Sequence, residues 1–172
     1  MEDEWVLKIC SAGSYQVGKT SLIRRYAENK FETNYIPTLG VDITTKRIVV
    51  DNQRIKLILM DTAGQELFGN NLRRTYYEGA SGCIIVYDIT RPETFEALTH
   101  WITDFRSVSS NAPIVIIGNK IDLENLRQVT TQEGENWAKE HEIPFYECSA
   151  KLGGDLIPQI YVDLVRDYFK SL

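Results

Sequence analysis

The feature that most constrains this chain is the loop of residues 13–21, GSYQVGKTS, which directly follows an apolar run at residues 5–10. The pattern G-x-x-x-x-G-K-[ST] is fulfilled at all of its fixed positions, which are Gly13, Gly18, Lys19 and Thr20. A loop of this kind between a strand and a helix turns successive backbone N–H groups toward a polyphosphate, and the helix start adds a positive end. The Lys19 ammonium can reach the outer phosphates, and the Thr20 hydroxyl can bind Mg²⁺. The motif predicts a nucleotide phosphate site, although a chance match in front of a surface helix is the alternative that the motif alone leaves open.

Strand-like apolar runs alternate with helical patterns along the whole chain. The runs at residues 83–87 and 114–117 are apolar and β-branched, which is typical of strands buried on both faces. Residues 41–50 and 54–60 flank the turn Asp51-Asn52-Gln53 and predict a hairpin. The alternation predicts an α/β sheet that is mostly parallel, with helices on both faces and one antiparallel edge. In such a sheet a ligand binds where the carboxyl ends of the strands meet the loops, and the phosphate loop follows a strand in this way.

Length, charge and cysteine content limit the class of protein. The 172 residues indicate one globular domain, residues 1–172, and the net charge of −5 argues against a nucleic-acid groove or a polybasic membrane patch. Three scattered cysteines, Cys10, Cys83 and Cys148, fit neither a disulfide framework nor a metal site, so we expect buried thiols. Apolar runs fall short of the ~20 residues that a membrane span needs, and no lipidation motif is evident. We expect a cytoplasmic monomer that associates with membranes only if a lipidated tail is missing from this chain.

A second loop, residues 61–66 (DTAGQE), follows the strand expected to pair beside the phosphate loop. The Asp61 carboxylate can support Mg²⁺, usually through water, on the side opposite Thr20. Gly64 has no side chain, so its N–H can approach a terminal phosphate, and Gln65 carries the donor and acceptor that suit it to orient an attacking water. In isolation the same residues would also suit an ordinary turn after a strand.

A third loop, residues 119–122 (NKID), offers a way to recognise a base. The Asp122 carboxylate can accept hydrogen bonds from both the N1–H and the 2-amino group of guanine, a donor pair that adenine lacks. Asn119 can brace the neighbouring loops, and the stem of Lys120 can cover one face of the base. Taken alone, this string is more often a solvated turn.

Two loops give weaker signals. In residues 149–151 (SAK), the small Ala150 lets a backbone N–H approach the carbonyl oxygen of the base. In residues 31–40, Thr38 can give its hydroxyl to Mg²⁺ and its N–H to the γ-phosphate, and Phe31 can stack edge-on against the base. We expect the latter loop to be ordered only while a γ-phosphate is present, and a plain loop hydroxyl is the alternative for Thr38.

Together and in this order, the motifs GSYQVGKT, DTAGQ, NKID and SAK resemble those of the small GTPases of the Ras superfamily, from Val6 to Phe169. The stretches LGVDI, DTAGQE, YYEGA and IVYDIT are most similar to the Rab branch. The resemblance implies an α/β P-loop small G domain with a six-stranded, mostly parallel sheet and five helices. It also implies a switch in Rab-like trafficking or signalling that binds GTP·Mg²⁺ and hydrolyses GTP slowly to GDP. Two switch loops, residues 31–43 and 61–78, would then control the binding of an effector, an exchange factor and an activating protein.

The resemblance gives a role to each matching residue. Gln65 and Lys19 would be catalytic, and Thr20, Thr38 and Asp61 would bind the metal. The nucleotide would be bound by Gly13, Tyr15, Gln16, Val17, Gly18, Lys19, Thr20, Ser21, Phe31, Thr38, Gly64, Asn119, Lys120, Asp122, Ser149, Ala150 and Lys151.

The chain departs from the family pattern in its phosphate loop, at the positions that partners read and at its end. The phosphate loop carries Tyr15 and Gln16 where small residues are usual, and bulk at the third position obstructs an activating arginine and the water-positioning glutamine. Leu67 stands where an arginine is usual, and a prenylation cysteine near the end is missing. The surface trio of aromatic residues that effectors read in Rab proteins is matched here by Ile43, Met60 and Tyr76. We therefore expect a partner set that differs from that of typical Rab proteins.

Two alternative functions stay open at this point. A GTP-loaded binding scaffold that scarcely hydrolyses would follow if Tyr15 and Gln16 shut out catalysis, although the intact Gln65 argues against it. A P-loop kinase or ATPase would share the phosphate loop, but the NKID and SAK motifs argue against that class.

Overall fold

The computed structural model describes residues 4–33, 40–62 and 70–172, and in this part of the chain six strands form one sheet. The strands are β1 (Trp5–Ala12), β2 (Val41–Val50), β3 (Gln53–Thr62), β4 (Gly82–Asp88), β5 (Ile114–Asn119) and β6 (Phe145–Cys148). Their order across the sheet is β2-β3-β1-β4-β5-β6. β2 runs antiparallel to β3, and the remaining neighbours are parallel. The predicted sheet, with its one antiparallel edge, is confirmed.

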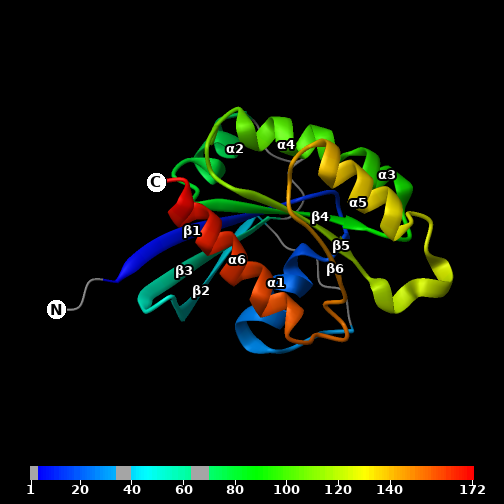
Figure 1. The fold of residues 1–172 in the computed structure, drawn as a ribbon, viewed down its shortest axis with the longest axis horizontal. Helices are drawn as coiled ribbons and strands as arrows, with labels where there is room; N and C mark the ends of the chain where they lie inside the picture. Colours follow the sequence, from blue (N-terminus) through cyan, green and yellow to red (C-terminus); the bar gives the residue numbers. More distant parts are fainter. Residues whose placement is uncertain (1–3, 34–39, 63–69) are drawn as a thin grey trace.

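Helices cover both faces of this sheet. One face carries α1 (Lys19–Glu28) and α6 (Leu156–Lys170), and the other carries α2 (Asn70–Tyr77), α3 (Pro92–Glu96), α4 (Leu98–Arg106) and α5 (Thr131–Glu140) (Figure 1). A 3₁₀ helix, η2 (Ile121–Leu126), follows β5. Within the described ranges, none of the helices combines the length and the apolar character needed to cross a membrane.

The described residues contain six α-helices, one more than the resemblance implies. The additional helix arises at Ala97, which separates α3 from α4. Its ψ of −7° lies far from the α-helical value of about −42°, so the helix tightens into a turn there and restarts at Leu98. Alanine is the best helix former, and nothing in its side chain marks this break.

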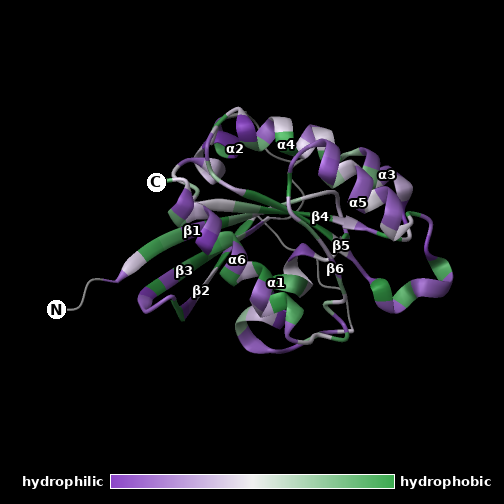
Figure 2. Ribbon diagram, in the orientation of Figure 1, coloured by the Kyte–Doolittle hydropathy of each residue, from purple (hydrophilic) through white to green (hydrophobic). Residues whose placement is uncertain are grey.

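Alternate residues of the central strands pack against opposite helix layers. In β4, Ile84 and Val86 belong to the core cluster under α1 and α6, whereas Cys83, Ile85 and Tyr87 belong to the cluster under the helices of the other face. Figure 2 shows hydrophobic residues along the central strands between the two helix layers. Burial on both faces explains why these strands are continuous apolar runs rather than alternating ones.

The hairpin between β2 and β3 has a shorter turn than the sequence suggests. Gln53 already belongs to β3, so the turn consists of Asp51 and Asn52, with φ angles of 49° and 65°. Two consecutive left-handed residues form the tight turn whose twist matches paired strands, and Asp and Asn tolerate that conformation well.

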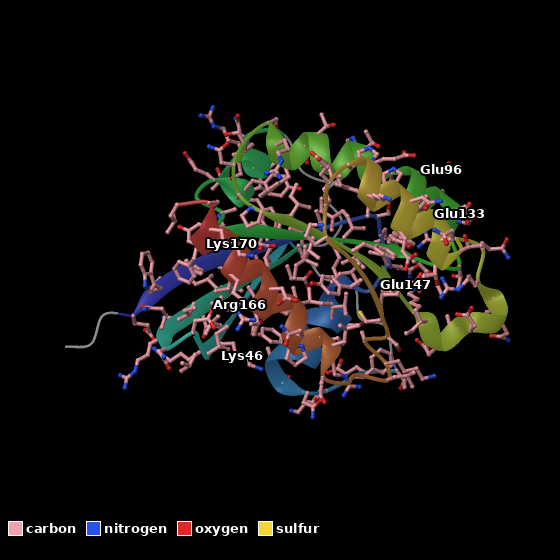
Figure 3. The ribbon with its side chains drawn as sticks, viewed as in Figure 1. Lys46, Glu96, Glu133, Glu147, Arg166 and Lys170 are labelled. Atoms are coloured by element: carbon pink, nitrogen blue, oxygen red, sulfur yellow. The ribbon has the colours of Figure 1, made fainter. Side chains whose placement is uncertain are left out.

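Helix α6 is attached to helix α1 and to the turn of the β2–β3 hairpin. Tyr161 stacks on Tyr26 of α1 with ring centroids 3.7 Å apart and planes 3° apart, and the Lys46 ammonium lies 4.2 Å from the Tyr26 ring. On its outer side, Arg166 donates to both carboxylate oxygens of Asp51 at 3.0 and 2.8 Å, toward the β2–β3 hairpin (Figure 3). These contacts fix α6 relative to the strand that follows the first predicted switch loop.

All three cysteines are free and buried, as predicted. Burial raises the pKa of Cys10 and of Cys148 to about 12, and it holds the pKa of Cys83 well above its ordinary value. Thiols that stay protonated near neutral pH are weak nucleophiles, so these residues act as small apolar side chains in the core.

Candidate nucleotide-binding site

Three of the predicted loops follow parallel strands and therefore lie at one edge of the sheet. Residues 13–18 connect β1 to α1, residues 119–122 begin at the end of β5, and residues 149–151 follow β6. The carboxyl ends of parallel strands meet at the same edge, which is where ligands bind in open α/β sheets. The fold thus brings together motifs that are more than a hundred residues apart.

The two fixed glycines of the phosphate loop are required by its backbone and by its neighbours. Gly13 has a φ of 135°, and a Cβ there would lie 2.3 Å from the Val86 carbonyl oxygen. Gly18 has a φ of 103°, and a Cβ there would lie 2.2 Å from Nδ2 of Asn119. Gln16 is also left-handed, with a φ of 61°. The loop is therefore a tightly packed turn whose backbone conformation suits inward-facing N–H groups.

Lys19 lies inside the curve of this loop. It is the first residue of α1 and only 6 % exposed, and its Nζ donates to the Gly13 and Ser14 carbonyls at 2.8 and 2.9 Å. A buried ammonium is tolerated only with good hydrogen-bond acceptors, and these two carbonyls supply them. The positive charge is held at the start of a helix, where the backbone also favours anions.

Thr20 and Asp61 form a second polar pair beside the loop. The Thr20 hydroxyl donates to Oδ2 of Asp61 at 2.5 Å, and Asp61 lies at the buried end of β3. A hydroxyl and a carboxylate are the hard oxygen ligands that Mg²⁺ prefers. The chemistry of these two oxygens would fit a divalent cation.

The buried side chain of Asn119 joins three loops. Asn119 is 2 % exposed, its Nδ2 donates to the Val17 carbonyl at 2.9 Å, and its Oδ1 accepts from the Ala150 N–H at 3.1 Å. From the sequence we predict that a backbone N–H at Ala150 can approach the carbonyl oxygen of a base, and in the structure the Ala150 N–H itself donates to the Asn119 carboxamide. A buried backbone N–H needs a partner, and Asn119 supplies one.

Lys120 and Asp122 are fixed by residues outside their own motif. Lys120 Nζ donates to the Gln16 carbonyl at 2.8 Å and lies 2.6 Å from Oδ2 of the buried Asp88. Asp122 Oδ1 accepts a hydrogen bond from the Ser149 hydroxyl at 2.6 Å. The stem of Lys120 therefore runs from the base loop to the phosphate loop, and the Asp122 carboxylate is held by the SAK loop.

Several residues that support the site belong to no motif. Arg25 of α1 donates to the carbonyls of Ala150 and Lys151 at 2.8 and 2.7 Å. Arg127, just after η2, makes a two-point ion pair with Glu147 of β6 at 2.7 and 3.1 Å (Glu147 is labelled in Figure 3). Hydrogen bonds from Arg127 to Glu147 raise the pKa of Arg127 above its ordinary value. In the sequence, this pair is marked only by its positions, because Arg127 lies shortly after the NKID loop and Glu147 shortly before the SAK loop.

The other predicted nucleotide residues lie around the same loops. Val17 is fully buried in the core, so only its backbone can face a ligand, and Ser21 is partly buried on α1. Phe31 is half-buried and packs against the core cluster under α1 and α6. Tyr15 is exposed, and its carbonyl accepts a hydrogen bond from Arg91. Thr38, Gly64, Gln65 and Leu67 lie outside the described residues.

The expected surface trio needs a correction. Ile43 is exposed and Met60 is partly buried, but Tyr76 is only 3 % exposed. Tyr76 belongs to α2, and its hydroxyl lies within hydrogen-bond distance of the Ser11 and Met60 carbonyls, at 3.0 and 2.8 Å. Burial holds its pKa well above the ordinary value, so it is a neutral core phenol. Of the three residues, only Ile43 has an exposed side chain.

Comparison with known families gives one match over nearly the whole chain. The model of the Ras family matches residues 8–170. The matched range includes the phosphate loop, the loop after β3 and both base-side loops.

Proposed function

The chain belongs to the Ras family of GTP-binding switch GTPases, and from this we propose that it is a Rab-like guanine-nucleotide switch that binds GTP·Mg²⁺ and hydrolyses GTP slowly. Residues 1–172 would form one G domain. The observation that carries the proposal is the contact of Asn119 with both Val17 and Ala150. Through these two hydrogen bonds, one side chain holds the phosphate loop, the NKID loop and the SAK loop next to one another. Family members generally act through regulator and effector proteins, and we propose an effector, an exchange factor and an activating protein for this chain.

Lys19, Thr20 and Asp61 support the phosphate and metal part of the proposal. The buried Lys19 ammonium would face the outer phosphates and stabilise charge that develops between them. Mg²⁺ would be held by Thr20 and Thr38, with Asp61 in support, and when bound it would neutralise charge on the phosphate oxygens. Gln65 would orient the attacking water, and Gly64 would offer its N–H to the terminal phosphate.

The base part of the proposal rests on Asp122. Its carboxylate is held by Ser149 and would accept from the N1–H and 2-amino groups of guanine. Lys120, whose stem runs across toward Gln16, would cover one face of the base, and Phe31 would contact it from the edge. Adenine offers no such donor pair and would leave the carboxylate unsatisfied, so we expect strong preference for guanine.

A GTP-loaded scaffold with poor hydrolysis is the second candidate. The observation in its favour is that bulky residues are built into the phosphate loop, with Gln16 in a left-handed conformation and Tyr15 beside it. In that case the protein would still bind GTP and partners, but an activating arginine would have restricted access to the phosphates.

Two measurements on the full chain test these proposals. Calorimetric titration with GDP, GTP and ATP should show guanine nucleotides bound about 100-fold or more tightly than ATP, and equal affinities would contradict guanine recognition.

Single-turnover phosphate release should proceed on the order of 10⁻⁴ s⁻¹ for the native chain, and more slowly for Gln65→Leu. If Tyr15→Gly is markedly faster than the native chain, the scaffold is favoured; equal rates favour an ordinary switch.

A further inference from the structure

Three consecutive carbonyls of the phosphate loop accept hydrogen bonds from side chains outside it. The Tyr15 carbonyl accepts from Arg91 Nη1 at 2.8 Å, the Gln16 carbonyl from Lys120 at 2.8 Å, and the Val17 carbonyl from Asn119 at 2.9 Å. The donors of the second and third bonds belong to the NKID loop. Arg91 does not: it follows β4 and belongs to none of the four motifs.

We propose that Arg91 is a positioning residue of the phosphate loop, which fixes the Tyr15–Gln16 peptide so that the Gln16 N–H faces the bound phosphates. This inference rests on the proposed function, because it gives the loop a nucleotide to bind. It goes beyond the motifs, because it adds a third outside contact to the two that the NKID loop provides.

The geometry of the peptide bond links the carbonyl to the N–H. A trans peptide unit is planar, so the carbonyl oxygen of one residue and the N–H of the next point in opposite directions. None of the peptide bonds among the described residues is cis. A Tyr15 carbonyl held toward Arg91 therefore turns the Gln16 N–H to the other side of the loop. Lys120 and Asn119 turn the next two N–H groups in the same way, which gives the run of donors that an anion-binding loop needs.

The Tyr15–Gln16 peptide needs such support more than its neighbours do. Gln16 has a φ of 61°, in the left-handed region that non-glycine residues rarely adopt, and Tyr15 beside it is exposed. Both side chains lie outside the apolar core, which buries Val17 one residue further on. A strained backbone persists only where surrounding contacts fix it, and Arg91 makes one of these contacts.

Arg91 is itself well positioned for this role. Its Nε donates to Oε1 of Glu93 at 2.9 Å while its Nη1 reaches Tyr15. Its backbone is held at both ends, because its N–H donates to the Asp88 carbonyl at 3.0 Å and its carbonyl accepts from the Thr94 hydroxyl at 2.7 Å. The planar guanidinium satisfies both partners at once, whereas a lysine at this position could serve only one of them at a time.

The test is the rate at which fluorescently labelled GDP leaves the full chain. For Arg91→Ala we expect release about tenfold faster than native, which corresponds to the loss of one charge-assisted hydrogen bond. Arg91→Lys keeps the charge but can serve only one of the two partners at a time, so it should release GDP faster than the native chain and more slowly than Arg91→Ala. The matched control is Arg166→Ala, which removes an exposed arginine with a two-point ion pair on the β2–β3 hairpin and should leave release unchanged.

Thermal unfolding of each variant separates positioning from mere structural support. If Arg91→Ala lowers the melting temperature but releases GDP at the native rate, the positioning role is overturned. If Arg91→Ala does not fold, Glu93→Ala and Arg91→Lys decide the matter: release faster than native supports the role, and native release in both overturns it. Failure of the native chain to bind GDP would overturn the proposed function and this inference together, whereas normal binding with unchanged release overturns this inference alone.

Discussion

Asn119 donates a hydrogen bond from Nδ2 to the Val17 carbonyl at 2.9 Å, across 102 positions of sequence. The same carboxamide accepts from the Ala150 N–H at 3.1 Å, so one buried side chain holds the loops after β1, β5 and β6 together. A residue in this position affects both the stability of the fold and the binding of the nucleotide.

Replacing Asn119 with alanine should therefore damage both properties. The variant removes the hydrogen-bond partner of the Val17 carbonyl and of the Ala150 N–H, both of which are buried. Each group left without its partner costs about 1–3 kcal/mol of stability. We expect the free energy of unfolding to fall by about 2–6 kcal/mol and GDP affinity to fall about tenfold or more. Urea denaturation and calorimetry measure the two effects. Asn119→Asp keeps an acceptor for the Ala150 N–H but sets a buried carboxylate against the Val17 carbonyl, so it should be at least as damaging as Asn119→Ala. A native-like Asn119→Ala would refute the bracing role.

Gly18→Ala should abolish nucleotide binding, and Gly154→Ala provides a matched control. Both glycines have nearly the same φ, 103° and 106°, but a Cβ at position 18 would lie 2.2 Å from Asn119, whereas a Cβ at position 154 meets nothing within 4 Å. Backbone strain alone costs about 1–2 kcal/mol, so Gly154→Ala should be mildly destabilised and bind GDP normally. GDP titration of both variants checks this. If the two variants bind GDP equally well, the close contact with Asn119 is not the reason that position 18 requires a glycine.

Stability should decline in alkaline solution, and Tyr26 should contribute to the decline. Burial raises the pKa of Tyr26 to about 12 from an ordinary value of 10.0. A raised pKa in the folded state means that the stabilisation is complete below pH 10.0 and is lost as pH rises from there toward about 12. Tyr26→Phe keeps a ring for Tyr161 to stack on but removes the titrating hydroxyl. Urea midpoints measured between about pH 8 and pH 11.5 should fall less steeply for this variant; identical slopes would contradict the assignment.

The sheet and the loops of the site could be predicted because they depend on local sequence. Glycines at fixed spacing, apolar runs of strand length and turn residues after strands are visible without coordinates. The β2–β3 hairpin, though not the exact length of its turn, and the buried strand at residues 83–87 follow from such patterns, and the loops meet because parallel strands share an edge.

The contacts that complete the site could not be predicted, because they depend on how distant side chains meet. Arg25, Arg91 and Arg127 all hold site loops, yet in the sequence each is an ordinary surface arginine. The sequence places Tyr76 at the surface, but its hydroxyl finds two buried carbonyls, one of them on Ser11, 65 positions earlier in the chain. The break at Ala97 likewise has no marker in its side chain.

Guanine recognition by Asp122, on which the proposed function depends, is tested most directly by Asp122→Asn. An amide at this position would set a donor against the 2-amino group of guanine but would match the 2-oxo group of xanthine. Calorimetric titration of native and variant chains with GDP and xanthosine diphosphate should show GDP affinity falling about 100-fold, with xanthosine diphosphate becoming the tighter ligand. Unchanged GDP affinity in the variant would contradict recognition of guanine by this carboxylate.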